Sequence, residues 1–189
     1  MKKKGLAMVL ALVLLAVCAV SGTLAWLTAK SDVVVNTFTT SDIKVELKET
    51  TGTEYKMIPG YTIRKDPQAT VLTGSEECYL FVKLDESTNF KNYMTYEMVE
   101  GWTVVPGETN VYFRKVLTTD IGTPYSVLKD NQVTVKDTVT KEQMNALDVE
   151  GAVKPTLTIT AYASQLYKSA GVKFTAADAW KNVNPTTNP

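Results

Sequence analysis

The stretch Thr156-Leu157-Thr158-Ile159-Thr160-Ala161-Tyr162-Ala163 has the most regular pattern in this chain of 189 residues. Apolar side chains occupy every second position of the stretch, and threonine or tyrosine fills the positions between them. Successive side chains of a β-strand point to opposite faces, so a period of two predicts a strand with one buried face. This strand is the starting point for predicting the fold class.

Four other segments predict strands. Residues 43–47 alternate apolar with charged side chains, and residues 133–135 alternate valine with threonine. Residues 111–117 are rich in branched and aromatic side chains. The run Cys78–Leu84 is almost entirely apolar, which is typical of a strand buried on both faces. Turn-forming residues separate these segments, for example Pro106-Gly107.

Two short helices are predicted near the C-terminus. Thr140–Leu147 begins with a hydroxyl residue suited to the N-cap, and Gln143 stands at the position that completes a capping box. Thr175–Trp180 has a similar arrangement, with Asp178 three residues after the capping threonine. The last segment, Asn182–Pro189, consists mainly of Asn, Thr and Pro and predicts a disordered tail.

Together these elements predict an all-β fold, an antiparallel β-sandwich with one or two short helices. Strands do not alternate regularly with helices, so a parallel α/β sheet is not expected. We find no internal repeat and no boundary of a second domain, and we therefore expect one domain over residues 26–181.

Composition excludes several classes of function. The chain has no histidine, which rules out a histidine general base, a histidine-containing triad and the usual zinc-ligand sets. Basic and acidic residues are equal in number, so there is no basic surplus for nucleic acid. Apart from Cys18, the one cysteine is Cys78, which we expect to be a buried, inert thiol. We predict no enzyme activity, no catalytic residue, no metal site and no cofactor.

The N-terminus has the three parts of a secretory signal peptide. Lys2–Lys4 is basic, Gly5–Val20 is uncharged and apolar, and Thr23 and Ala25 are small residues three positions before and one position before a cut. Residues 1–25 are the predicted signal peptide, and Trp26 is the predicted first residue of the mature chain. Removing the three lysines would give the mature chain a net charge near −3.

Two other interpretations of this segment stay open. Gly5–Leu27 carries no charge and is long enough to span a bilayer, so it would anchor the protein if it were not cut. Leu15–Cys18 also has some likeness to a lipoprotein signal, although Val17 is a poor residue before a lipidated cysteine.

The export junction Gly22–Leu27, followed by Asn36–Thr39, resembles that of the TasA, CalY and camelysin family of Gram-positive bacteria. Within the body, Met57–Gly60, Lys65–Pro67 and Tyr79–Lys83 are similar to the core of that family. The resemblance implies cleavage by a SipW-like signal peptidase and a place outside the cell, at the cell surface or in the extracellular matrix. It also implies a jelly-roll-like sandwich that builds biofilm-matrix fibres.

In that family, subunits join when a segment freed by cleavage adds a strand to a neighbour's sheet. Here the corresponding segment is residues 26–40. Within it Asp32–Thr39 has the β-branched and aromatic side chains that such a donor strand needs. The predicted assembly residues are Val33, Val34, Val35 and Phe38. The alternative is that this segment is the first strand of its own domain.

Three further interpretations concern ligands and catalysis. A monomeric surface module that contacts host or glycan ligands would use loop aromatics such as Trp102 and Tyr125. A metallopeptidase role follows from the family label, but the His-Glu-x-x-His motif is missing. The acidic pairs Glu76-Glu77 and Asp85-Glu86 are candidates for weak calcium binding, or are solvated turns. Membrane contact is expected only through the N-terminal segment of the precursor.

Overall fold

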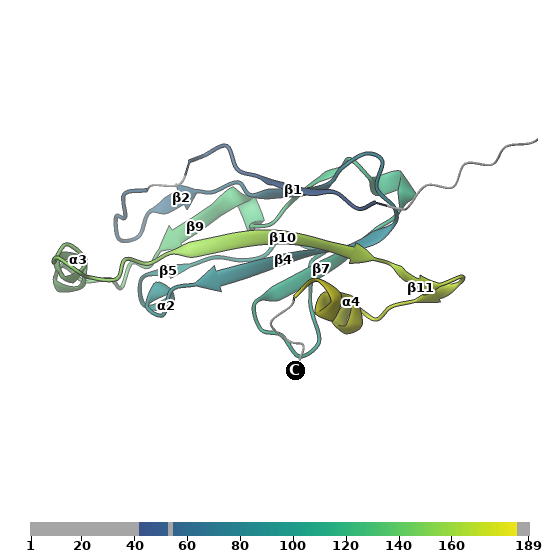
Figure 1. The fold of residues 1–189 in the computed structure, drawn as a ribbon. Coiled ribbons are helices and arrows are strands. Elements are labelled where there is room, and N and C mark those ends of the chain that lie inside the picture. Colours follow the sequence, from purple (N-terminus) through teal and green to yellow (C-terminus); the bar gives the residue numbers. More distant parts are fainter. Residues whose placement is uncertain (1–41, 53–54, 185–189) are drawn as a thin grey trace, which may run out of the picture. The chain divides into compact units, whose positions relative to one another are not determined.

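The computed structural model describes residues 42–52 and 55–184, which fall within one compact unit. This part of the chain is mostly β, with a few short helices and several antiparallel sheets (Figure 1). The strands are β1 (Val45–Lys48), β2 (Thr62–Arg64), β3 (Gln68–Val71), β4 (Cys78–Glu86), β5 (Met94–Thr95), β6 (Thr103–Val104), β7 (Val111–Val116), β8 (Pro124–Ser126), β9 (Gln132–Val135), β10 (Leu157–Gln165), β11 (Tyr167–Ser169) and β12 (Val172–Lys173). The helices are α2 (Phe90–Tyr93), α3 (Lys141–Leu147) and α4 (Ala176–Val183), with 3₁₀ turns at Thr118–Asp120 and Lys129–Asn131.

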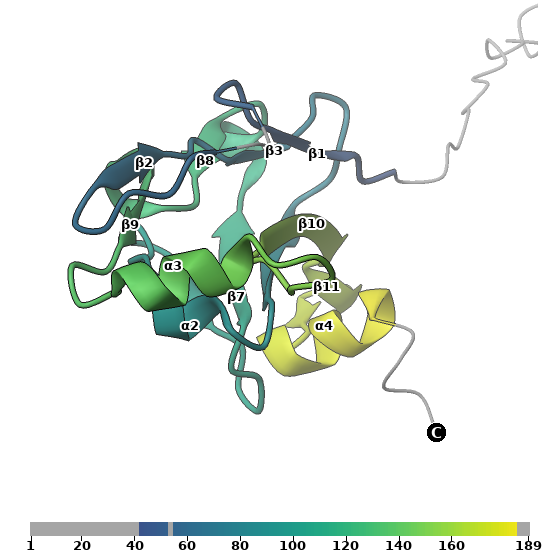
Figure 2. The same ribbon diagram turned by 90° about the vertical axis from the view of Figure 1, so that its left-hand side faces the viewer.

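The strands form two facing layers. One layer contains the β1-β3-β8 sheet, and the other is the β10-β4-β7-β6 sheet, which lies beneath it in Figure 2. A third sheet, β2-β9-β5, contributes to the same interior, and β11 and β12 form a separate hairpin. Every strand pairing in the described residues is antiparallel. The expected all-β class is therefore confirmed as a layered, sandwich-like arrangement.

Strand β4 lies at the centre of the larger sheet and is buried on both faces. Its pairing with β10 runs without a break from Leu157 opposite Glu86 to Gln165 opposite Cys78. The residues at even positions of β4 enter the main core between the layers, while Tyr79 and Phe81 enter a second cluster on the outer face. The period of two therefore divides one strand between two cores, as the apolar run in the sequence predicted.

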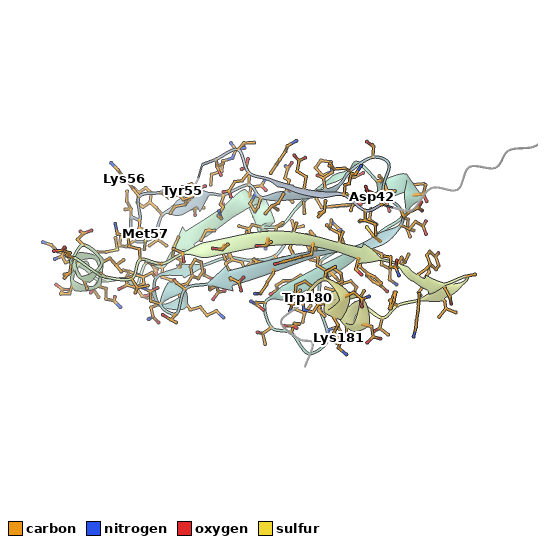
Figure 3. All side chains as sticks on the ribbon, in the orientation of Figure 1. Asp42, Tyr55, Lys56, Met57, Trp180 and Lys181 are labelled. Atoms are coloured by element: carbon orange, nitrogen blue, oxygen red, sulfur yellow. The ribbon has the colours of Figure 1, made fainter. Side chains whose placement is uncertain are left out.

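Helix α4 covers the outer face of the larger sheet and completes the second core. Trp180 is 2% exposed, and its ring lies 5.4 Å from that of Phe81 and 5.2 Å from that of Tyr162. Its indole N–H donates a hydrogen bond of 2.9 Å to Glu108. Trp180 is next to Lys181 on the helix, and Lys181 extends toward solvent (Figure 3).

Local signals located the two larger helices correctly. The hydroxyl of Thr140 accepts a bond from the Gln143 N–H, and the Gln143 side chain accepts one from the Thr140 N–H, which makes a complete capping box. The Thr175 hydroxyl caps α4 by accepting from the Asp178 N–H. The predicted start of the tail at residue 182 is two residues early. Helix α4 continues to Val183, because that apolar side chain packs against the second core.

The single-turn helix α2 was not predicted. It has four residues, and neither a side-chain cap nor an acidic first turn marks its start. Phe90 and Tyr93 are buried in the main core, so tertiary packing rather than a local signal stabilises this turn. No described helix has the length and apolar character needed to span a membrane, and Gly5–Leu27 lies outside the described residues.

The buried carboxylate of Asp66 forms hydrogen bonds with the segment that follows β1. The Asp66 side chain accepts hydrogen bonds from the hydroxyl and N–H of Thr50 and from the N–H of Thr51, at 2.5, 2.9 and 3.1 Å. These bonds favour the ionised form and lower the pKa of Asp66 from 3.8 to about 2. Because the pKa is lower in the folded state, the carboxylate stabilises the fold above pH 3.8, and this stabilisation is lost as the pH falls toward 2.

We therefore expect Asp66→Asn to lower the thermal midpoint most at neutral pH. The difference from the unaltered protein should shrink as the pH falls from 3.8 to about 2, since Asp66 itself then becomes neutral. Circular dichroism melts at several pH values measure this difference, and the exposed Glu150→Gln variant is the matched control. A difference that stays constant with pH would contradict the role given to the ionised carboxylate.

Candidate functional site

The residues predicted for processing and assembly all lie outside the described part of the chain. These residues are Thr23, Ala25, Trp26, Val33, Val34, Val35 and Phe38. Their roles stay predictions. The described domain can, however, be examined for a surface that would accept an added strand.

Strands β1 and β10 form a pair of neighbouring edges on one side of the domain. Among the strands of residues 42–52 and 55–184, β1 is the last strand of its sheet and pairs with β3 alone, while β10 is the last strand of the opposite sheet and pairs with β4 alone. The two strands lie close together without pairing (Figure 1). We call this side the β1–β10 edge. Within the described residues, each of the two strands has one side without a strand partner.

Apolar side chains at the β1–β10 edge are only half buried. This group comprises Ile43 just before β1, Val45 and Leu47 on β1, and Leu157, Ile159, Ala161 and Ala163 on β10, all of which pack against the main core. By contrast, Ala69 and Val71 on β3, and Leu80 and Val82 on β4, are 0% exposed. Central strands are thus sealed, whereas the edge strands leave part of the core surface accessible.

β10 also lacks the features that usually protect an edge strand. It has nine residues, and none of them is charged or proline. Natural edge strands are commonly short, or carry lysine, proline or a bulge that prevents pairing with another chain. In β10 the register with β4 is continuous over all nine residues. A long, regular and uncharged edge is suited to accept a further strand.

The opposite side of the sandwich is closed by a stack of three side chains. Arg114 on β7 lies over two aromatic rings, with its guanidinium carbon 3.9 Å from the centre of the Tyr125 ring and 5.1 Å from that of Trp102. The Trp102 indole N–H donates to the Ser126 carbonyl at 2.9 Å, which joins the segment before β6 to β8. We call these three residues the Arg114 stack. It connects the two layers where β7 and β8 meet.

Three of the four carboxylates predicted as weak calcium ligands, those of Glu77, Asp85 and Glu86, have protein partners. Glu77 accepts bonds from the N–H and hydroxyl of Thr118 at 3.2 and 3.1 Å, and these bonds lower the pKa of its carboxyl. Asp85 contacts Lys83 and Asn110. Glu86 accepts from Tyr96 and pairs with Lys91. In the described residues, no group of three or more potential metal ligands is present.

Cys78 has the environment that the sequence predicted. Its side chain is 0% exposed at the start of β4, and burial raises the pKa of the thiol to about 11. A protonated, enclosed thiol is a poor nucleophile, so Cys78 acts as a small apolar core residue.

Sequence reasoning identified two of the three residues of the Arg114 stack and missed the third. Trp102 and Tyr125 were expected in loops; this is wrong for Tyr125, which lies on β8, and Arg114 had no assigned role within its predicted strand. Gly101 is the other residue that was missed. Its φ is +91°, and a Cβ there would lie 2.3 Å from an Arg114 nitrogen. The sequence offered one signal, the Gly101-Trp102 pair, but nothing in it placed this pair beside residue 114.

Comparison with family models, curated proteins and solved structures finds no significant match to this chain. The resemblance to the TasA, CalY and camelysin family therefore stays a prediction, and the functional argument depends on the geometry of the described domain.

Proposed function

We propose that this protein is an exported structural protein of a Gram-positive cell surface or extracellular matrix, whose subunits assemble by strand exchange. In this proposal a SipW-like peptidase removes residues 1–25, and Asp32–Thr39 of one subunit adds to the β1–β10 edge of the next. The added strand would complete a jelly-roll-like sandwich. The protein works as a building unit and not as an enzyme, in keeping with the absence of histidine from the chain.

The observation that carries the proposal is the uncharged, nine-residue edge of β10 beside the unpaired edge of β1. An extended segment that pairs there gains main-chain hydrogen bonds, and its alternate side chains cover the half-buried residues of both edge strands. The Arg114 stack closes the other side of the sandwich. Among the described residues the other terminal strands of these three sheets, β2, β5, β6 and β8, have only two or three residues, so β10 offers an incoming strand the longest edge.

The segment that precedes the domain matches this edge in chemistry. Asp32–Thr39 contains three consecutive valines and a phenylalanine. Such residues have high β propensity and cover apolar surface efficiently. Strand β1 begins at Val45, so five residues lie between Thr39 and the start of that strand. Because a short connection also permits a hairpin with the chain's own β1, the experiment must separate pairing between subunits from pairing within one.

We expect the double substitution Val34→Asp/Phe38→Asp to abolish polymerisation of the mature protein without unfolding the monomer. If residues 32–39 add as an extended strand, the two side chains would share one face, and two carboxylates there would have to be buried against apolar side chains. Sedimentation velocity measures assembly, and circular dichroism measures the β content. The matched control, Val33→Asp/Thr37→Asp, places the same two charges on the opposite face and should still polymerise.

Two results would contradict this expectation. If Val34→Asp/Phe38→Asp unfolds the monomer, the segment is an intramolecular strand. If neither folding nor assembly changes, the segment is a passive linker, and strand exchange through residues 32–39 is wrong.

A further inference from the structure

Arg114 has more hydrogen-bonding capacity than the protein uses. Its guanidinium lies over the Tyr125 ring at 3.9 Å and the Trp102 ring at 5.1 Å. Within the described residues its side chain has neither an ion pair nor a hydrogen bond, and its guanidinium lies against these two rings. A guanidinium has five N–H donors, and all of them lie in its plane rather than on the faces that rings cover.

The unused donors of Arg114 reach solvent. Among the described residues, Asn131 Oδ1 is the one buried side-chain polar atom that lacks a partner. Arg114 is half buried, and its guanidinium nitrogens are not among the buried polar atoms that lack a partner. The nitrogens of Arg114 that have no partner are therefore accessible to solvent. Burial nevertheless lowers the pKa of Arg114, since the charge has lost part of its hydration. An anion that supplied acceptors would restore that lost solvation.

The surroundings hold the guanidinium in a fixed place. Gly101 gives it room, because a Cβ at this position would lie 2.3 Å from an Arg114 nitrogen. Trp102, the next residue, is fixed by its hydrogen bond to Ser126. Two rings and a close backbone therefore orient the group before any ligand arrives, which reduces the entropy lost on binding.

Nearby charge selects among anions. Asp120 is close enough to influence both Arg114 and Tyr125 electrostatically, yet it is not paired with the guanidinium. Its negative charge opposes binding of a dianion more strongly than binding of a monoanion. A carboxylate has one charge, and its two oxygens match the planar fork of arginine.

We propose that the Arg114 stack is a binding site for a ligand carboxylate, which accepts in-plane hydrogen bonds from the Arg114 guanidinium while Trp102 and Tyr125 hold that group in place. The site lies on the side of the sandwich away from the β1–β10 edge, and it requires neither assembly nor strand exchange. It gives the protein a recognition function in addition to its proposed structural role.

The test is a titration of the mature protein, followed by NMR at the Arg114 Nε–H and the Trp102 indole N–H. The probes are glucuronate, which is a sugar acid, and N-acetylglutamate amide, which carries an amino-acid side-chain carboxylate. Glucose and N-acetylglutamine amide are their neutral counterparts. We expect a saturable shift of both signals with at least one acid and not with its neutral counterpart. The acid that binds more tightly identifies the kind of molecule that carries the carboxylate.

Three variants make the result specific. Arg114→Lys keeps the charge but loses the planar fork, and should weaken binding about tenfold or more. Asp120→Asn removes the opposing charge and should tighten binding. Lys115→Gln removes a cation from the other face of β7, where Lys115 lies over Tyr79, and should leave the affinity unchanged. Heteronuclear spectra show whether each variant is folded.

Other outcomes would overturn the proposal. One is a titration in which neither acid gives a saturable shift, and another is an equal shift with the neutral compounds. The proposal is also wrong if folded Arg114→Lys and Asp120→Asn both bind the acid with the affinity of the unaltered protein.

Discussion

Replacing Trp180 by alanine should lower the free energy of unfolding by about 3–5 kcal/mol, the usual cost of removing a large buried aromatic side chain. Trp180 is 2% exposed and contacts Phe81 and Tyr162, so its loss leaves a cavity between α4 and the larger sheet. The loss also removes the indole N–H that donates a hydrogen bond to the Glu108 carboxylate. Chemical denaturation followed by circular dichroism measures the change.

Lys181→Ala is the matched control for this prediction. Lys181 follows Trp180 on α4, but its side chain is 65% exposed and forms only a surface ion pair of 3.5 Å with Asp178. Such pairs contribute about 0–1 kcal/mol, so the control should remain close to the unaltered protein. If Trp180→Ala were as stable as Lys181→Ala, α4 would not be part of the folded core.

If subunits join by the proposed strand exchange, removing residues 1–40 should give a soluble monomer that stops the growth of other chains. The truncated protein keeps the described domain, and therefore the β1–β10 edge, but has no segment to donate. It can accept a donor strand from the end of a growing polymer and offers none in return. We expect small amounts added to the mature full-length protein to shorten the fibres in proportion, as measured by electron microscopy and sedimentation.

A second truncated protein tests whether the shortening of fibres depends on strand addition at β10. Ala161→Lys places a long cation at a half-buried, inward-facing position of β10, and inward-pointing charges are a natural means of blocking edge strands. With this substitution the truncated protein should no longer shorten fibres. If it shortens them as well as the unaltered truncated protein does, the acceptor is not β10. If the protein without residues 1–40 polymerises alone, strand exchange through this segment is wrong.

The sequence by itself determined the elements whose signals are local. Alternation at Leu157–Ala163 and the apolar run at Cys78–Leu84 were sufficient to predict β10 and β4, because a strand's period of two follows from backbone geometry alone. The caps Thr140 and Thr175 marked the starts of α3 and α4, since a capping hydroxyl bonds to N–H groups only two or three residues away. The absence of histidine from the sequence was sufficient to exclude a histidine general base, a histidine-containing triad and the usual zinc-ligand sets.

Only the tertiary structure decided which strands lie at the edges of the sheets and which face of the larger sheet α4 covers. The period of two shows that β10 has an apolar face, but not that β10 is an edge strand, because strand order depends on pairings between residues far apart in the chain, as in Ala163 opposite Leu80. In the same way, α4 was recognisable as a helix, yet its position over Tyr79 and Phe81 was not. The Arg114 stack joins residues from three separate segments, and its geometry arises only when the two layers meet. The backbone preference of a segment depends on neighbouring residues. Strand order, the position of α4 over the sheet and the Arg114 stack depend instead on contacts between residues far apart in the chain, which no short stretch of sequence specifies.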